Sequence, residues 1–109
     1  MSEVFNHADL DCPTVPRHLE IKISQDNWTW INKVTMQLYH CYVLNTPSRY
    51  VRDIKPWMIR GYWLIQYFAN PSEENFHFLI NAIHDYKLID NNLMLLEFIA
   101  DLKSRVKSC

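Results

Sequence analysis

The chain has 109 residues, with 11 lysines and arginines against 12 aspartates and glutamates, which gives a formal net charge of −1. This length is typical of one compact domain, and the near-neutral charge offers no whole-molecule argument for a nucleic-acid or membrane-surface partner. The single glycine, Gly61, excludes phosphate-cradling loops, dinucleotide-binding turns and nucleophile elbows, because those motifs need glycine at several tightly bent positions.

The cysteines and the apolar stretches indicate the cellular compartment of the protein. The three cysteines, Cys12, Cys41 and Cys109, are widely spaced and form no CxxC pair, so we expect free thiols and neither a disulfide framework nor a zinc site. No apolar stretch approaches the roughly 20 residues of a membrane-spanning helix. The N-terminal residues lack a basic segment followed by an apolar one, so we expect a cytoplasmic protein without membrane contact.

The N-terminal part of the sequence predicts an irregular arm followed by a short strand. Residues 1–17 carry two prolines and no periodicity, whereas 18–109 form the expected single helical domain. Apolar and polar residues alternate over 18–23, which is typical of a half-buried strand. A lone strand needs a partner, and the arm, a second copy of the chain or another protein's sheet edge could each provide one.

The first predicted helix begins at the capping side chains of Ser24, Gln25 and Asp26 and runs to about Leu44. Its apolar stripe also places Cys41 in the core. On a helical wheel the stripe is formed by Ile31, Val34, Leu38 and Cys41, with Trp30 and Tyr42 at its margins.

The middle of the chain predicts a short helix and a buried one. Thr46 and Pro47 suit the cap and first position of a short helix that ends at about Lys55. Pro56 then opens a helix over 57–69 that is apolar or aromatic at nearly every position. This composition predicts the central helix of the fold.

The C-terminal part predicts two helices that pack as an antiparallel hairpin. Residues 70–73 match a capping box with proline at the first helical position, and the helix that follows runs to about Lys87. A polar turn at 90–92 leads into a helix over 93–106. Its apolar stripe comprises Leu95, Phe98, Ile99, Leu102 and Val106. The predicted fold class is therefore mainly α, a compact bundle of about four to five helices with an irregular N-terminal arm.

The five histidines do not predict a metal site. His77 and His84 share the polar side of one predicted helix, but seven residues separate them by about 10.5 Å along its axis. Two imidazoles on one zinc ion must each reach within roughly 2.1 Å of it. We therefore expect no metal, no cofactor and no catalytic residue, although a site assembled across space from distant residues stays open.

Charge is distributed unevenly. Residues 45–62 carry a net charge of +3, whereas residues 70–101 carry −5. The basic side chains of the first segment are Arg49, Arg52, Lys55 and Arg60. Aromatic residues lie among them, and arginines beside aromatic rings are typical both of protein interfaces and of single-stranded nucleic-acid sites.

Two aromatic edges extend this candidate surface. Arg60, Trp63 and Tyr67 align at i, i+3 and i+7 on the helix over 57–69. A second edge on the first helix runs through Trp28, Thr35 and Tyr39. A chain of this size covers only part of its apolar surface, so leftover aromatic ridges tend to become interfaces.

These patterns favour a binding protein over an enzyme. The expected function is a non-enzymatic protein-binding module, such as an adaptor, an immunity protein or an inhibitor of the kind that phages and mobile elements encode. The expected partner is another protein, and a second copy of the chain would also fit. The alternatives are a nucleic-acid-binding regulator that uses the Arg49, Arg52, Lys55 and Arg60 patch, and a small enzyme with a site assembled across space.

Overall fold

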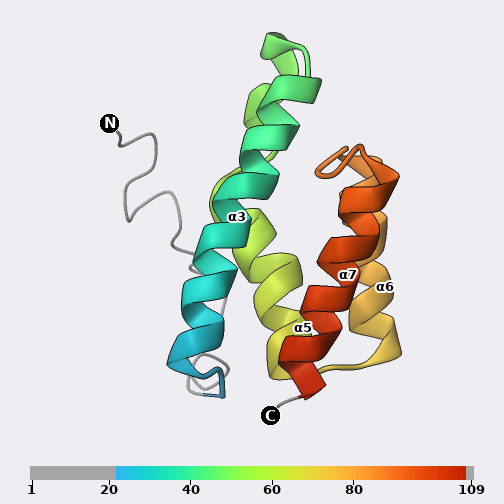
Figure 1. The fold of residues 1–109 in the computed structure, drawn as a ribbon. Helices are drawn as coiled ribbons and strands as arrows, with labels where there is room; N and C mark the ends of the chain where they lie inside the picture. The colour runs from blue at the N-terminus through green and yellow to red at the C-terminus, as the bar shows by residue number, and fades with distance from the viewer. Residues whose placement is uncertain (1–21, 108–109) are drawn as a thin grey trace.

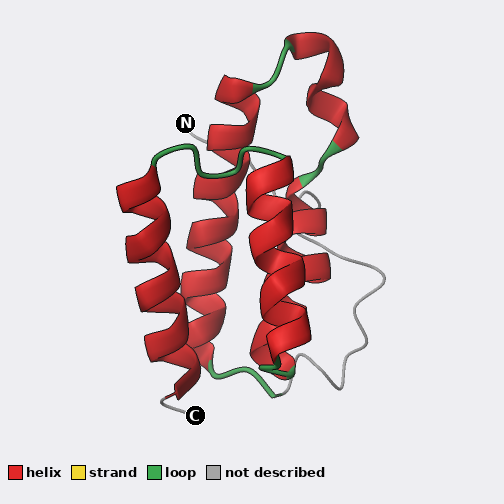
Figure 2. Ribbon diagram, turned by 90° about the vertical axis from the view of Figure 1, so that its right-hand side faces the viewer, coloured by secondary structure: helices red, strands yellow, loops and turns green. Residues whose placement is uncertain are grey.

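The computed structural model describes residues 22–107, and all the secondary structure in that range is helical (Figures 1 and 2). This confirms the predicted mainly-α bundle. The elements are α3 (Gln25–Asn45), η1 (Ser48–Asp53), α4 (Pro56–Met58), η2 (Ile59–Ile65), α5 (Gln66–Ala69), α6 (Glu73–Asp85) and α7 (Asn92–Lys107). The predicted arm over 1–17 lies outside the described residues.

The strand predicted over 18–23 is not present where the structure describes it. Lys22 and Ile23 form a turn, and the preceding residues of that segment lie outside the described range. Ile23 is buried in the hydrophobic core, so its apolar side chain contributes to the helical packing. Alternation over so few residues does not distinguish a strand from a lead-in to a helix.

Local signals determine where α3 begins and ends. The Ser24 side chain accepts a hydrogen bond from the Asn27 backbone N–H at 3.2 Å, which satisfies one of the unpaired donors of the first turn. The helix ends at Asn45, directly before Thr46 and Pro47, because a proline disfavours helical geometry in the residue that precedes it. The predicted bounds of this helix are confirmed within one residue.

The central helix is continuous over α4, η2 and α5, but its middle is a π-helix. Pro56 occupies its first position, as predicted, and η2 packs against both α3 and α6. Ile59, Leu64 and Ile65 are completely buried, which confirms that this is the central helix of the core. The widened turn of η2 was not predicted from the sequence.

Helices α6 and α7 run antiparallel, as the sequence predicts (Figure 1). The N-cap of α6 is Ser72, which accepts a hydrogen bond from the Asn75 backbone N–H at 3.1 Å, and not the predicted Asn70. Asn70 contacts α6 through its backbone instead, because the side-chain amide of Asn75 donates a hydrogen bond to the Asn70 carbonyl at 2.9 Å. After α6, Lys87 adopts a φ of 54°, and this left-handed residue reverses the chain toward α7.

Candidate interaction surfaces

The predicted basic patch is only partly exposed. Arg49 lies on η1 with its guanidinium 4.9 Å from the centre of the Tyr50 ring, and both side chains are exposed. Lys55 is also exposed, in the connection to the central helix. The side chain of Arg52 lies outside the described part of the structure. Arg49 and Lys55 are thus the two cations of the predicted patch that are exposed in the described part of the structure, and we call this pair the basic edge.

Arg60 has a structural role that the sequence did not reveal. Its Nε donates to Asn32 Oδ1 at 2.9 Å, and its guanidinium lies 4.6 Å from the centre of the Trp28 ring. Both partners lie on α3, so Arg60 connects the central helix to α3. The predicted contact residues Arg60 and Trp28 thus bind each other and are both half-buried.

The expectation that Tyr67 lies on an exposed edge is wrong. Tyr67 is only 6% exposed, and its ring packs against Phe68 and Phe76. The physical reason is the π-helix between Arg60 and Tyr67, because i→i+5 hydrogen bonding changes the angle between successive residues. Residues at i and i+7 across such a segment do not share one face as they do in an α-helix. Burial raises the pKa of the Tyr67 hydroxyl above its ordinary value.

Trp63 and Tyr39 belong to a continuous series of ring contacts that joins three elements. We call this series the aromatic chain, and in order it comprises Trp57, Tyr62, Trp63, Tyr86, Tyr42 and Tyr39. Successive ring centres lie between 5.6 Å and 6.5 Å apart, within the range of favourable edge and tilted contacts. The aromatic chain connects three elements: the central helix, the residue that follows α6, and α3.

The exposed members of the aromatic chain are two tyrosines that sequence reasoning did not select. Tyr62 is 41% exposed and Tyr86 is 39% exposed, and both contact Trp63, which is half-buried. Tyr86 follows Leu79 and Ile83 at i+7 and i+3, so the apolar stripe of α6 could have pointed to it. Tyr62 carries no such signal, because only tertiary packing shows which residues of an apolar helix stay at the surface.

The buried member of the aromatic chain, Tyr42, is hydrogen-bonded to η1. The Tyr42 hydroxyl donates a hydrogen bond to the Tyr50 carbonyl at 2.8 Å, which holds the segment with Arg49 against α3. Burial raises the pKa of this hydroxyl, and the nearby Asp53 carboxylate raises it further. The segment with Arg49 therefore lies next to the aromatic chain, and Tyr42, Tyr50 and Tyr86 line one hollow between them.

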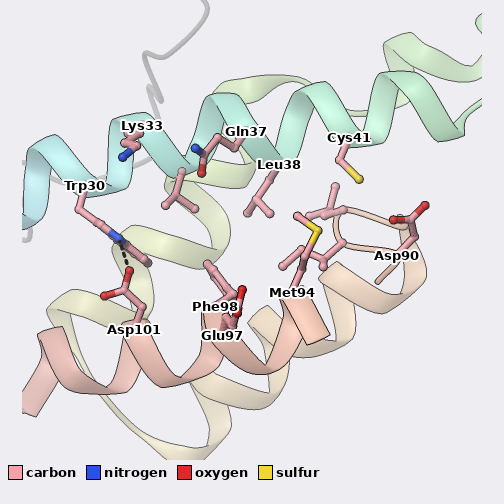
Figure 3. Close-up of a pocket in the computed structure, with 13 residues that line it drawn as sticks. Trp30, Lys33, Gln37, Leu38, Cys41, Asp90, Met94, Glu97, Phe98 and Asp101 are labelled. Atoms are coloured by element: carbon pink, nitrogen blue, oxygen red, sulfur yellow. Dashed lines mark hydrogen bonds between the residues drawn. The ribbon is translucent and has the colours of Figure 1, made fainter. Parts of the chain in front are cut away.

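A separate groove runs between α3 and α7 (Figure 3). Its volume is about 290 Å³, and its apolar lining includes Trp30, Val34, Leu38, Met94 and Phe98. We call this hollow the α3–α7 groove. It was not predicted, because the sequence placed its α3 residues either in the core stripe or on the outer polar face.

Each end of the α3–α7 groove is closed by a polar contact. At one end Trp30 Nε1 donates to Asp101 Oδ2 at 2.9 Å, as the dashed line in Figure 3 shows. At the other end the Cys41 thiol donates to the Lys87 carbonyl at 3.7 Å and accepts from the Asn45 amide. Cys41 is therefore half-buried at the groove's edge. The prediction that it lies in the core is wrong.

The surroundings of Cys41 keep it in its thiol form. Burial raises the pKa of the Cys41 thiol, and the negative charge of Asp90 raises it further. Since the thiolate is the nucleophilic form of cysteine, both effects lower its reactivity near neutral pH.

The two histidines of α6, His77 and His84, are exposed, and each lies near a neighbouring acid. His77 Nε2 lies 3.3 Å from Glu73 Oε1, and His84 Nδ1 lies 3.7 Å from Asp85 Oδ1. Within residues 22–107 there is no group of three or more histidine, cysteine or acidic side chains arranged to hold a metal ion. In the same range no helix combines the length and apolar character needed to cross a membrane.

Comparison of the chain with protein-family models, with curated proteins and with solved structures finds no match.

Proposed function

We propose that this protein is a non-enzymatic protein-binding module and that the aromatic chain with its basic edge forms the binding surface. The observation that carries the proposal is the pair of exposed rings, Tyr62 and Tyr86, on either side of Trp63. Tyrosine, tryptophan and arginine are the residues most enriched at the energetic centres of protein interfaces. Rings already held by neighbouring rings lose little conformational entropy when a partner binds them.

The charge of the basic edge defines the partner more closely. Arg49 and Lys55 are exposed at the end of the surface, and Arg49 already lies over the Tyr50 ring. Exposed cations of this kind steer an acidic partner toward the interface and fix its orientation. The proposed partner is accordingly a protein with an acidic rim around an apolar contact, as an adaptor, an immunity protein or an inhibitor would bind. The free thiol of Cys41 favours the reducing cytoplasm as the compartment.

The nucleic-acid alternative has less support from the arrangement of charges. Of its four basic residues, Arg60 is engaged by Asn32 and Trp28, which leaves Arg49 and Lys55 as the described cations on the exposed edge. Single-stranded nucleic acid is bound along a positively charged groove with successive bases stacked on rings. The experiment below makes this alternative one of its outcomes.

The proposal is tested by affinity capture from the native host with nuclease-treated extracts and quantitative mass spectrometry. The double variant Tyr62→Ala/Tyr86→Ala is expected to lose the captured protein, and Arg49→Glu to weaken its capture. The matched control is Phe78→Ala, which removes a ring that is 56% exposed on α6 and takes no part in the aromatic chain. Circular dichroism establishes that all variants fold.

Two outcomes would overturn the proposal. In the first, the tyrosine double variant captures the same proteins as the wild type. In the second, the purified protein binds unrelated single-stranded oligonucleotides with an affinity that falls steeply with salt, by a logarithmic slope of about 0.7 per phosphate contacted. The second result would establish the nucleic-acid alternative in its place.

A further inference from the structure

We infer that the α3–α7 groove is a second docking site, which takes a short basic amphipathic helix from a partner protein. This site is separate from the aromatic chain and goes beyond the proposed function. The inference rests on the groove's apolar floor, on its length and on the charges along its two edges.

The floor of the groove is apolar and adaptable. Met94 is 59% exposed, although it lies between α3 and α7 beside the half-buried ring of Phe98 (Figure 3). Methionine is unbranched and polarizable, so it reshapes to fit the side chains of a partner, and interfaces that accept helices use it often. Trp30 and Leu38, which both line the groove from α3, are buried and supply a rigid base.

The length of the groove matches three turns of a helix. Its α3 lining runs from Trp30 to Cys41, which corresponds to about 16 Å along the helix axis. This distance accommodates apolar anchors at i, i+3 or i+4, and i+7 of a bound helix. A volume of about 290 Å³ is at the lower limit for sites that bury a drug-sized ligand, so it suits inserted side chains better than a whole small molecule.

The charges along the edges select a basic helix. Asp90, Glu97 and Asp101 line the α7 side of the groove, whereas Lys33 lies on the α3 side. Asp101 already binds Trp30 and Arg105, but Asp90 and Glu97 are exposed and form no ion pair with the described residues. A helix with lysines or arginines on one flank and a polar or acidic residue on the other therefore complements both edges and binds in one direction.

The test uses synthetic fluorescent peptides and the full-length protein. The basic probe is a peptide of about 14 residues with leucines at i, i+3, i+4 and i+7 and lysines along one flank. The control probe has glutamates at the lysine positions. Fluorescence anisotropy at low and at physiological salt gives the dissociation constants, and we expect the basic probe to bind about tenfold more tightly than the acidic one.

Two variants of the groove test where the probe binds. The charge reversal Asp90→Lys/Glu97→Lys should weaken the basic probe by about tenfold and allow the acidic probe to bind. Gln37→Trp places a large ring in the groove from the exposed side of α3 and should block both probes. The matched controls are Glu74→Lys, an exposed acid on α6, and Leu93→Ala, an exposed apolar residue of α7 that does not line the groove.

The outcomes separate this inference from the proposed function. Loss of probe binding in the groove variants alone, with Tyr62→Ala/Tyr86→Ala unaffected, supports the groove as a distinct site. Equal binding of both probes, or equal loss in the groove variants and their controls, would overturn the inference. Self-association that sedimentation velocity detects without any peptide, and that Gln37→Trp abolishes, would also overturn it, because the groove would then hold a second copy of the chain.

Discussion

The indole nitrogen of Trp30 on α3 donates a hydrogen bond of 2.9 Å to Asp101 on α7, across 71 residues of sequence. Arg105, one turn later on α7, completes the arrangement, since its Nε lies 3.3 Å from Asp101 and its guanidinium 5.1 Å from the centre of the Trp30 ring. This contact sets how α7 lies against α3 at one end of the groove. It also satisfies the polar atom of a tryptophan that is otherwise buried in the core.

Asp101→Ala is expected to destabilise the protein by about 1–3 kcal/mol, because it leaves the buried Trp30 N–H without its acceptor. Asp101→Asn should cost less, since the amide oxygen still accepts. Urea denaturation gives both free energies of unfolding. Glu97→Ala, an exposed acid on the same helix, is the control and should stay within about 0.5 kcal/mol of the wild type. A loss for Glu97→Ala as large as that for Asp101→Ala would contradict the structural role of the contact.

Leu102→Ala should lower the free energy of unfolding by about 2–5 kcal/mol, because the Leu102 side chain is completely buried between α7 and the core. Leu96→Ala removes the same atoms from an exposed position of the same helix and should change little. Chemical denaturation of the two variants gives the comparison. If both unfold like the wild type, α7 does not pack as part of the bundle.

Thr35→Val is expected to stabilise the protein by about 1–3 kcal/mol, because the completely buried Thr35 hydroxyl has no hydrogen-bond partner in the described part of the chain. Valine has the same shape and needs no partner. Thr29→Val on the same helix is the control, since the exposed Thr29 hydroxyl donates to the Gln25 carbonyl and its loss brings no gain. Thermal and urea unfolding give the stabilities of both variants. If Thr35→Val were less stable than the wild type, the Thr35 hydroxyl would have to bind a water molecule or another group.

Arg60→Ala should destabilise the fold by about 1–2 kcal/mol, because it removes both the hydrogen bond to Asn32 and the contact with the Trp28 ring. Arg49→Ala removes a cation that is exposed beside Tyr50 and should leave stability within about 0.5 kcal/mol. Urea denaturation distinguishes the two arginines. Equal effects would mean that Arg60 is as dispensable to folding as a surface charge.

Alkylation of Cys41 should be slow near neutral pH, because the raised pKa keeps the thiol protonated. The rate should increase only at a pH higher than the pH at which an ordinary thiol ionises. The rate is measured against pH with iodoacetamide in a Cys12→Ser/Cys109→Ser background. Asp90→Asn removes a negative charge that favours the protonated form, so it should lower the pKa and speed alkylation. Glu97→Gln, which neutralises another acid of the groove, serves as the control.

The same shift affects stability. Because the folded-state pKa of Cys41 lies above the unfolded one, the folded chain holds this proton more tightly. The resulting stabilisation is fully present below about pH 8.5 and is lost as the pH rises through the folded-state value. A midpoint of unfolding that increased over this alkaline range in the wild type, but not in Cys41→Ala, would contradict the assignment.

The sequence by itself determined most of the helices and the identity of the central one. Caps and breakers act over a few residues, and so Ser24 and Pro56 could be read directly as helix boundaries. The short helix η1 begins one residue later than predicted, with Pro47 and not Thr46 as its cap. The apolar stripe of α7 likewise predicted that Leu102 would be buried. The cap of α6 is Ser72 and not Asn70, because both residues carry side chains that can cap a helix and the pattern alone did not show which of them accepts from the Asn75 backbone N–H.

Only the tertiary structure decided which side chains reach the surface together. The π-helical segment turned Tyr67 into the core, and Asn32 and Trp28 on α3 engaged Arg60. The aromatic chain and the α3–α7 groove both bring together residues that are distant in sequence. Helical periodicity assigns each residue to a face of its own helix, but it carries no information about the separation or the relative rotation of two helices. Those two quantities determine whether neighbouring faces close into a core or leave a groove.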